Sequence, residues 1–479
     1  MPSQTDDANF DEGSPTGAPV ASAGLPLATA PDLAQRSLTR SARLLSLPLG
    51  AAGRAAVGLG KRVGGAPAEQ VAAEMQARAA EQMFRVLGEL KGGAMKIGQA
   101  LSVLEAAMPE ELAGPYRQAL TRLQDAAPAL PIDRVHSVLA RELGSDWPER
   151  FPHLDEQPAA AASIGQVHRA TARDGREVAI KVQYPGADRA LLSDLEQAIR
   201  MARVFGSLVP GMDIKPLLSE VRARLTEELD YLQEADAQRA FAAAYEDDPD
   251  FVVPHVLAAT PHVLVSEWVD GIPLSAVIAN GTVAERNRAG LCYQRFLLSG
   301  PTRAGLLHAD PHPGNFRMLA DGRLCVFDYG AVARLPDGFP PAVGRLLAIA
   351  MREDAAAVLA GLRSEGFVKP GIAVDAESLM CYLSPFIEPA RTPEFHYRRE
   401  WLREQFSRIN DPRNPDFIVG MKLNLPPSYL LIHRVWLGSI SVLCQLGATV
   451  DSRNEISRWV PSFTDAQAPI SPPAPEVRQ

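Results

Sequence analysis

The chain has few of the features that mark secreted, disulfide-bonded or zinc-binding proteins. Its 479 residues contain four cysteines, which are scattered as Cys292, Cys325, Cys381 and Cys444 and form no CxxC pair. A disulfide framework or a zinc ribbon is therefore not expected, and a reducing compartment fits this usage. The first residues, MPSQTDDANFDEG, are acidic and polar, unlike a secretory signal.

Long hydrophobic runs and an excess of positive charge are also absent. No stretch of about 18 uncharged apolar residues occurs, which is the length that a membrane-spanning helix needs. The nearest candidate, residues 429–450, contains His433 and Arg434, and we expect a buried helix there. The formal net charge of −9 argues against general nucleic-acid binding, which needs a basic surface. We expect a cytoplasmic protein without a transmembrane helix, with peripheral membrane contact left open.

What remains is the composition of an ordinary globular protein, with 46% hydrophobic and 22% charged residues.

Residues 34–68 contain six basic residues and no acidic one, which fits either a linker or a segment lying on an anionic membrane surface. Changes in composition predict these segments: a disordered tail at 1–33, the basic apolar segment at 34–68, a helical region at 69–150, a small strand-rich region at 151–271, a large helical region at 272–460 and a mobile Pro-rich tail at 461–479.

Two polar clusters follow short apolar runs within residues 306–330. The clusters are His308, Asp310, His312 and Asn315, and then Asp328-Tyr329-Gly330. Carboxylates and an amide beside buried strands suit a hard divalent cation and a phosphate. Asp310, Asn315 and Asp328 follow one another at spacings of five and thirteen positions, the order seen in kinase catalytic loops. A metallohydrolase site built from the histidines and aspartates is the alternative at this point.

Upstream segments carry charged residues inside apolar patterns. In residues 159–183, the turn signal Asp174-Gly175 predicts a hairpin, and Lys181 stands in the middle of the strand VAIKV. A lysine there must be solvated or paired. A helix predicted at 217–241 carries Glu228, Asp230 and Glu234, a charge cluster that by itself would indicate a solvated face.

The remaining pattern is mostly helical. Residues 69–104 predict a helix in which Lys96 and Gln99 flank Gly98, and glycines inside such a pattern usually have a packing or functional reason. A lone helical lysine, however, is usually solvated. Strands are predicted at 251–257 and 262–269, and helices at 131–143, 283–298, 341–351, 354–366, 376–387 and 426–446.

Together these segments resemble the UbiB/AarF (ADCK) family of atypical protein-kinase-like proteins, over about residues 70–450. The matching motifs are KIGQ at 96–99 for the KxGQ motif, AAAASIGQVHRA at 159–170 for the alanine-rich loop, VAIKVQYPG with Lys181, ELD at 228–230 for the ExD motif, the following Glu234, HADPHPGN, and DYG. The resemblance implies an α+β, bilobal kinase-like fold. It has a small β-rich N-lobe, a large helical C-lobe and a helical KxGQ extension packed over the active site.

The resemblance also implies roles for individual residues. Asp310, Lys181 and Glu234 form the catalytic set, and Asn315 and Asp328 bind Mg²⁺ or Mn²⁺. ATP is held by Ala160, Ala161, Ala162, Ser163, Lys181 and Glu267. Regulation falls to the KxGQ and ExD residues Lys96, Gly98, Gln99, Glu228 and Asp230. His308-Ala309-Asp310 stands where kinases have HRD, so an arginine that would bind an activation-loop phosphate is missing.

The expected function is that of an atypical kinase or ATPase that supports isoprenoid quinone or other membrane lipid metabolism. A conventional protein kinase is not expected, because the KxGQ extension would obstruct a protein substrate. The expected partners are ATP, a lipid or prenyl-quinone intermediate and the membrane surface. The alternative is a non-catalytic lipid-binding module in which ATP only rearranges the KxGQ helices.

Overall fold

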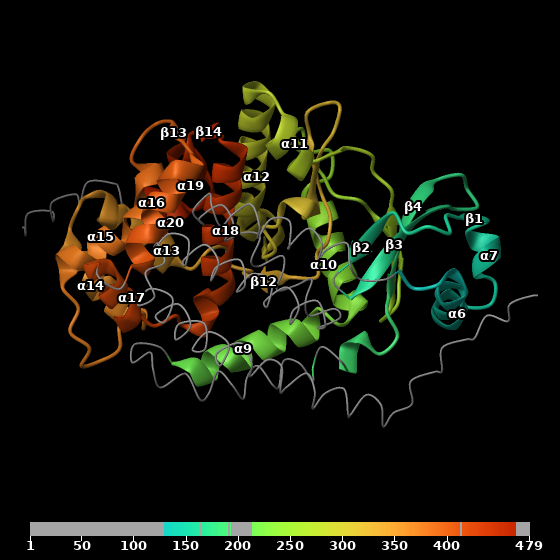
Figure 1. The fold of residues 1–479 in the computed structure, drawn as a ribbon, viewed down its shortest axis with the longest axis horizontal. Coiled ribbons are helices and arrows are strands. Elements are labelled where there is room, and N and C mark those ends of the chain that lie inside the picture. Colours follow the sequence, from blue (N-terminus) through green and yellow to red (C-terminus); the bar gives the residue numbers. More distant parts are fainter. Residues whose placement is uncertain (1–128, 163, 190–191, 193–212, 412–413, 466–479) are drawn as a thin grey trace, which may run out of the picture.

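The computed structural model describes residues 129–162, 164–189, 192, 213–411 and 414–465. The predicted tail at 1–33, the basic segment at 34–68 and the KxGQ helices with Lys96, Gly98 and Gln99 lie outside these residues. The described chain is α+β, as predicted: an antiparallel sheet at one end and a helical region at the other (Figure 1).

The first sheet has six strands in the order β1-β3-β4-β7-β6, with β2 paired to β3. Their bounds are His153–Leu154 (β1), Ala160–Ala162 (β2), Gly165–Thr171 (β3), Glu177–Gln183 (β4), Val256–Ala259 (β6) and Val263–Glu267 (β7). The predicted hairpin is β3-β4, in full register from Gly165↔Gln183 to Thr171↔Glu177. The predicted strand at 251–257 is wrong in its bounds, because Pro254 separates β5 (Phe251–Val252) from β6.

One face of this sheet carries a hydrophobic core of its own. Val178, Ile180 and Val182 alternate along β4 and are fully buried. They pack against Val135, Val138 and Leu139 of α6 (Ile132–Leu143), with α7 (Trp147–Arg150) beside it. The same alternation sends Ala179 and Lys181 to the opposite face, where they line a pocket.

The helix predicted at 217–241 is two helices, so that prediction is wrong. α9 covers Ile214–Glu227, α10 covers Tyr231–Ala244, and the ExD residues form the break between them. The break is locally specified, because the Asp230 carboxylate accepts the backbone N–H of Leu232 at 3.0 Å and so caps α10. α9 extends along the helical lobe in Figure 1, and the backbone N–H of Asp213 donates to Asn424 Oδ1 at 2.8 Å.

The second region begins with α11 (Leu274–Asn280) and α12 (Val283–Ala304). α12 extends one turn and a half beyond the predicted helix, past Pro301, and ends at Gly305 in the left-handed conformation. A four-stranded sheet follows the order β5-β11-β10-β8, and β9 pairs with β12. The bounds are Ile272–Pro273 (β8), Leu306–His308 (β9), Phe316–Met318 (β10), Leu324–Val326 (β11) and Val332–Arg334 (β12).

The rest of the chain is helical apart from the short pair β13 (Phe395–His396) and β14 (Thr449–Val450). The helices are α13 (Pro341–Met351), α14 (Ala355–Ser364), α15 (Ala376–Ile387), α16 (Arg399–Asn410), α17 (Pro415–Lys422), α18 (Leu430–Leu446), α19 (Ser452–Trp459) and α20 (Pro461–Asp465). The sequence pattern did not predict α16, α17 and α19. Residues 461–465 were expected in a mobile tail, but α20 packs on α13, where Gly344 leaves room for its backbone and Phe463 is fully buried.

One described helical stretch, Pro427–Leu446, is long and apolar enough to cross a membrane, and 50% of its apolar window is buried. Such a helix is also what the core of a lobe requires, and nine residues of α18 are buried. A single helix of this kind is weak support for a membrane span.

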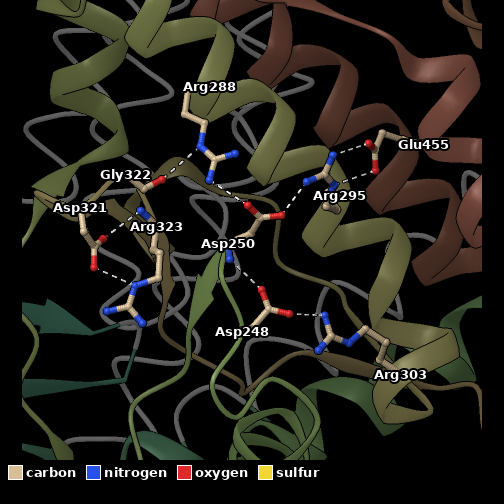
Figure 2. A network of polar contacts seen from close by, with 9 residues as sticks. All are labelled: Asp248, Asp250, Arg288, Arg295, Arg303, Asp321, Gly322, Arg323 and Glu455. Carbon is tan, nitrogen blue, oxygen red and sulfur yellow. Dashed lines mark hydrogen bonds and ion pairs between the residues drawn. The ribbon is translucent and has the colours of Figure 1, made fainter.

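An ionic network fixes the loop that follows α10. Figure 2 shows Asp250 between two arginines of α12, with a third arginine on the neighbouring Asp248. The members are Asp248, Asp250, Arg288, Arg295, Arg303 and Glu455. Arg295 connects two of the acids. It donates to Asp250, and it forms a bidentate contact with the carboxylate of Glu455 at 3.0 and 2.7 Å. The C-terminal end of α10 is thereby attached to α12 and α19.

Candidate functional site

A pocket of about 380 Å³ lies between the six-stranded sheet and the polar clusters of residues 306–330. β2, β4 and β7 form one side, α10 contributes Glu234 and Gln238, and the loops after β9 and β11 form the other side. Among the predicted site residues, its described lining includes Ala160, Ala161, Ala162, Lys181, Glu234, Glu267, Asn315 and Asp328. Residues predicted from distant motifs therefore meet in one place.

Lys181 is paired rather than solvated, which resolves the two alternatives for a lysine in an apolar strand. Its Nζ lies 2.6 and 2.9 Å from the two carboxylate oxygens of Glu234 and 3.4 Å from Asp328 Oδ2. Burial by itself would lower the pKa of Lys181, but the charges of Asp328 and Glu234 outweigh it and raise that pKa above its ordinary value. Lys181 is therefore a permanent cation at the base of the pocket.

Tyr231, the first residue of α10, is a site residue that sequence reasoning missed. Its ring lies under Lys181, with 5.1 Å from Nζ to the ring centroid. The hydroxyl is buried and has no hydrogen-bond partner within the described residues. A Cβ at Gly165 would lie 2.9 Å from this hydroxyl and 2.2 Å from the carbonyl oxygen of Val182. Only glycine at position 165 lets β3 pack this closely against the Tyr231 side chain.

Asp328 follows β11 in an unusual backbone conformation. Its φ is 56°, in the left-handed region that aspartate tolerates better than most residues. Oδ1 accepts the backbone N–H of Gly330 at 3.2 Å, and 26% of the side chain is exposed to the pocket. His308 Nε2 donates to the carbonyl oxygen of Asp328 at 3.0 Å, and burial lowers the pKa of His308. A neutral, buried histidine therefore holds the strained turn that presents the carboxylate.

Asp310 and Asn315 are linked to each other. Asn315 Nδ2 donates to the backbone carbonyl of Asp310 at 3.2 Å, which leaves the Asn315 side-chain oxygen as the atom able to face a cation. Asp310 is 3% exposed, and its Oδ1 accepts a hydrogen bond from Arg434 of α18 at 3.0 Å. Arg434 was noted in the sequence only as an interruption of an apolar run. A charge inside such a helix was the available signal, but nothing in the sequence named its partner.

The alanine-rich loop is a tight hairpin. β2 pairs with β3 from Ala160↔Val167 to Ala162↔Gly165, and Ser163 lies outside the described residues. Glu267, at the end of β7, lines the pocket and accepts the backbone N–H of His255 at 2.9 Å. Glu228 and Asp230 are not among the described lining residues, and Asp230 caps α10 instead.

The donors fit a magnesium-type ion better than a metallohydrolase centre. Among the described residues, no group of three or more His, Cys, Asp or Glu side chains could hold a metal ion. The ring of His308 is turned to a backbone carbonyl, which argues against the histidine-rich alternative. Mg²⁺ is commonly held by one or two carboxylate or amide oxygens together with substrate phosphates. Asp328 and Asn315 provide such a partial set.

This fold and site define a protein-kinase-like class: a β-rich lobe with a paired strand lysine, opposed by a helical lobe that carries Asp310, Asn315 and Asp328. The model of the ABC1 atypical kinase-like domain matches residues 122–361. The chain belongs to this family, the UbiB/AarF family of atypical kinase-like proteins, as the sequence predicted.

Named relatives agree with this assignment. The atypical kinase coq-8 of Caenorhabditis elegans is 33% identical over 58% of this chain and 37% of its own length. The atypical kinase COQ8 of Saccharomyces cerevisiae is 31% identical over 57% of this chain and 54% of its own length. The chain thus spans about half or less of these relatives, whose printed names place them in mitochondria.

A solved structure covers more of the chain. Rv3197 from Mycobacterium tuberculosis, described as a complex with erythromycin, is 42% identical. The match has a TM-score of 0.63 and covers 84% of this chain and 100% of that one.

Proposed function

We propose that the protein binds ATP with Mg²⁺ or Mn²⁺ in the pocket of Lys181 and acts as an atypical kinase or ATPase. The observation that carries the proposal is the contact of Lys181 with both Glu234 and Asp328 at the base of this pocket. In kinase-like sites a strand lysine pairs with a helix glutamate and holds the α- and β-phosphates, while an aspartate before a glycine holds the metal.

Several of the lining residues then have a role. Lys181 binds the phosphates and is positioned by Glu234 and by the ring of Tyr231. Asp328 and Asn315 would hold the metal ion, which would neutralise phosphate charge. Ala160, Ala161, Ala162 and Glu267 line the same pocket and would contact the nucleotide. The alanines have less φ freedom than glycine, so this loop adapts less to the nucleotide.

Asp310 accepts a proton from, or orients, the attacking hydroxyl or water. Arg434 is a positioning residue, because it acts through its contact with Asp310. Its guanidinium donates to one carboxylate oxygen of Asp310 and thereby orients that carboxylate. Neither Asp310 nor Arg434 is among the described lining residues of the pocket, and Asp310 lies next to it, between β9 and the lining residues His312 and Asn315. The family resemblance supports a physiological role in isoprenoid quinone or other membrane lipid metabolism.

Nucleotide binding is tested first, by the thermal shift that Mg²⁺–ATP produces in wild type and in Lys181→Ala. We expect the variant to lose the shift, because a charge-assisted phosphate contact contributes about 1.5–3 kcal/mol. Lys181→Arg is the matched control, because it keeps the positive charge but changes the geometry of the contact. An undiminished shift in Lys181→Ala would contradict the assignment of the pocket.

Turnover is tested separately with Asp310→Asn. A general base typically contributes about 10²–10⁴-fold to the rate, so we expect ATP hydrolysis to fall by that range while ATP binding persists. The assay is run with and without liposomes. Equal rates in wild type and variant would favour the alternative, a lipid-binding module that is only gated by nucleotide.

A further inference from the structure

The nucleotide pocket is lined by a second cation, Arg317, to which the roles given above assign nothing. Arg317 belongs to β10 and lines the pocket on the side opposite the six-stranded sheet. It stands two positions after Asn315, outside every motif that carries the family resemblance. Its side chain is partly buried, so it is neither a fully solvated arginine nor a member of the core.

The charge of Arg317 is not balanced by an acid. Within the residues that the structure describes, its guanidinium forms no ion pair and one hydrogen bond, from Nη1 to the backbone carbonyl oxygen of Gly271 at 3.4 Å. That distance is long for a hydrogen bond. Arg169, which lies over the pocket residue Trp268, is in contrast paired with Glu177 at 2.7 Å. A guanidinium has five N–H donors, so most of those of Arg317 are left for a ligand or water.

The backbone places Arg317 beyond the metal site. Asn315 and Arg317 both line the pocket, and Phe316 between them is extended, with φ −131° and ψ 140°. Two residues of extended chain span about 7 Å. The hydrogen bond to Gly271 directs the guanidinium toward the segment after β7, where residues 267–269 line the pocket. A nucleotide whose metal and phosphates are bound at Asn315 would therefore place its base at this end.

The walls at this end suit a flat aromatic base. Val167 and Ala179 line the pocket from β3 and β4. Phe327 lines it from the other side, and its ring centroid is 5.5 Å from the guanidinium carbon of Arg317. A planar guanidinium stacks on aromatic rings, and unstacked bases are held on arginine planes in the same way. A base between these two sides would cover apolar surface with one face and contact the cation with the other.

We propose that Arg317 binds the nucleoside part of the nucleotide, with the base stacked on its guanidinium. The inference rests on the proposed function, because the phosphates must be bound at Lys181 for the base to reach this end. Arg317 is a binding residue and takes no part in phosphoryl transfer. The base is remote from the phosphate that reacts, so the contact is equally strong before and during the reaction and acts on affinity alone.

Calorimetric titration of the full chain with ATP at fixed Mg²⁺ measures this contact. Arg317→Met keeps an unbranched side chain but removes the charge and the plane. We expect ATP affinity to fall about 3- to 30-fold, the range of cation–π contacts. Inorganic tripolyphosphate, which has no base, is titrated as well and should bind both proteins equally. Unchanged ATP affinity in the variant, or an equal loss for ATP and tripolyphosphate, overturns the proposal.

Arg323→Met is the matched control. Arg323 lies on the turn between β10 and β11, is paired with Asp321 and is not among the described lining residues, so this variant should bind ATP as wild type does. Lys181→Ala separates the inference from the proposed function. ATP binding that is lost in Lys181→Ala but unchanged in Arg317→Met contradicts the role of Arg317 alone. Binding that neither change affects contradicts the nucleotide assignment as well.

Arg317→Lys tests whether the plane or the charge matters. Lysine keeps the charge but has no planar group, so at a stacking site it should restore little of the ATP affinity. It also provides a second variant if Arg317→Met does not fold. In steady-state ATP hydrolysis both variants should show a raised KM with an unchanged kcat. Full recovery by lysine, or a lowered kcat at unchanged KM, overturns the proposal.

Discussion

Two acid–base networks in this molecule differ in how their charges are balanced. The network of Figure 2 sets three acids, Asp248, Asp250 and Glu455, against three arginines of α12. The nucleotide site sets Glu234, Asp310 and Asp328 against two cations, Lys181 and Arg434. The acids and arginines of the first network balance one another inside the helical lobe, whereas the charges of the second lie beside a pocket that a ligand can enter.

The difference separates a structural role from a functional one. A closed set of buried ion pairs needs no further group, and removing one partner leaves an uncompensated charge inside the protein. Charged side chains that line a pocket, as Lys181, Glu234 and Asp328 do, can in contrast contact a ligand from solution. Mutations should therefore affect stability in the first network and ligand binding in the second.

The largest effect is expected for Arg295→Ala. This change removes the partner of Glu455, which is 1% exposed, and one partner of Asp250, so the free energy of unfolding should fall by about 3–5 kcal/mol. Chemical denaturation measures it. Arg323→Ala is the matched control, because Arg323 and Asp321 are both exposed and should contribute little. A loss of equal size in the control would remove the distinction between buried and exposed pairs.

Asp328→Asn should weaken ligand binding rather than lower the stability of the fold. We expect the metal-dependent part of ATP binding to fall by about 10- to 100-fold, since a charged hydrogen-bond or ligand contact contributes about 1.5–3 kcal/mol. Stability should change less than in Arg295→Ala, because 26% of the Asp328 side chain is exposed to the pocket. Titration of ATP at fixed Mg²⁺, repeated with Mn²⁺ and with a chelator, measures the effect. Wild-type affinity in the variant would disprove the metal assignment.

Arg434→Gln should act on rate rather than on binding. Without the guanidinium, Asp310 is less firmly oriented, and we expect about a 10-fold loss of turnover with unchanged ATP affinity. The acid limb of the pH–rate profile should move to higher pH, because a carboxylate that loses a neighbouring cation takes up a proton more readily. Arg434→Lys should restore the position of the limb in part. An unshifted profile in Arg434→Gln would leave only a packing role.

The smallest effect concerns His433 of α18. Burial lowers its pKa in the folded state, so the unfolded chain binds a proton first as the pH falls below about 6.5. Stability is therefore lost from that pH downward until the folded-state pKa is passed. His433→Phe should reduce the difference in melting temperature between pH 7.5 and pH 5.5. If the melting temperatures of wild type and His433→Phe differ equally between the two pH values, His433 does not contribute to the pH dependence of stability.

The sequence predicted what depends on local pattern. Alternation along the strand of Lys181 predicted that this lysine is either solvated or paired, and the structure pairs it with Glu234. The order and spacing of the motifs predicted Asp310, Asn315 and Asp328 as site residues from the sequence alone. Family likeness then supplied the kinase-like class. The helix break at 228–230 was missed because no Pro or Gly separates the two helical segments, and only the Asp230 cap marks the junction.

What the tertiary structure decided lies in contacts between distant segments. Arg434 meets Asp310 across 124 positions, and Arg295 meets Glu455 across 160. An apolar pocket likewise exists only where α13, α14, α15 and α18 pack together. Side-chain periodicity is a property of neighbouring residues and can be read from the sequence, whereas the partner of a charge or the space between helices depends on how whole elements pack.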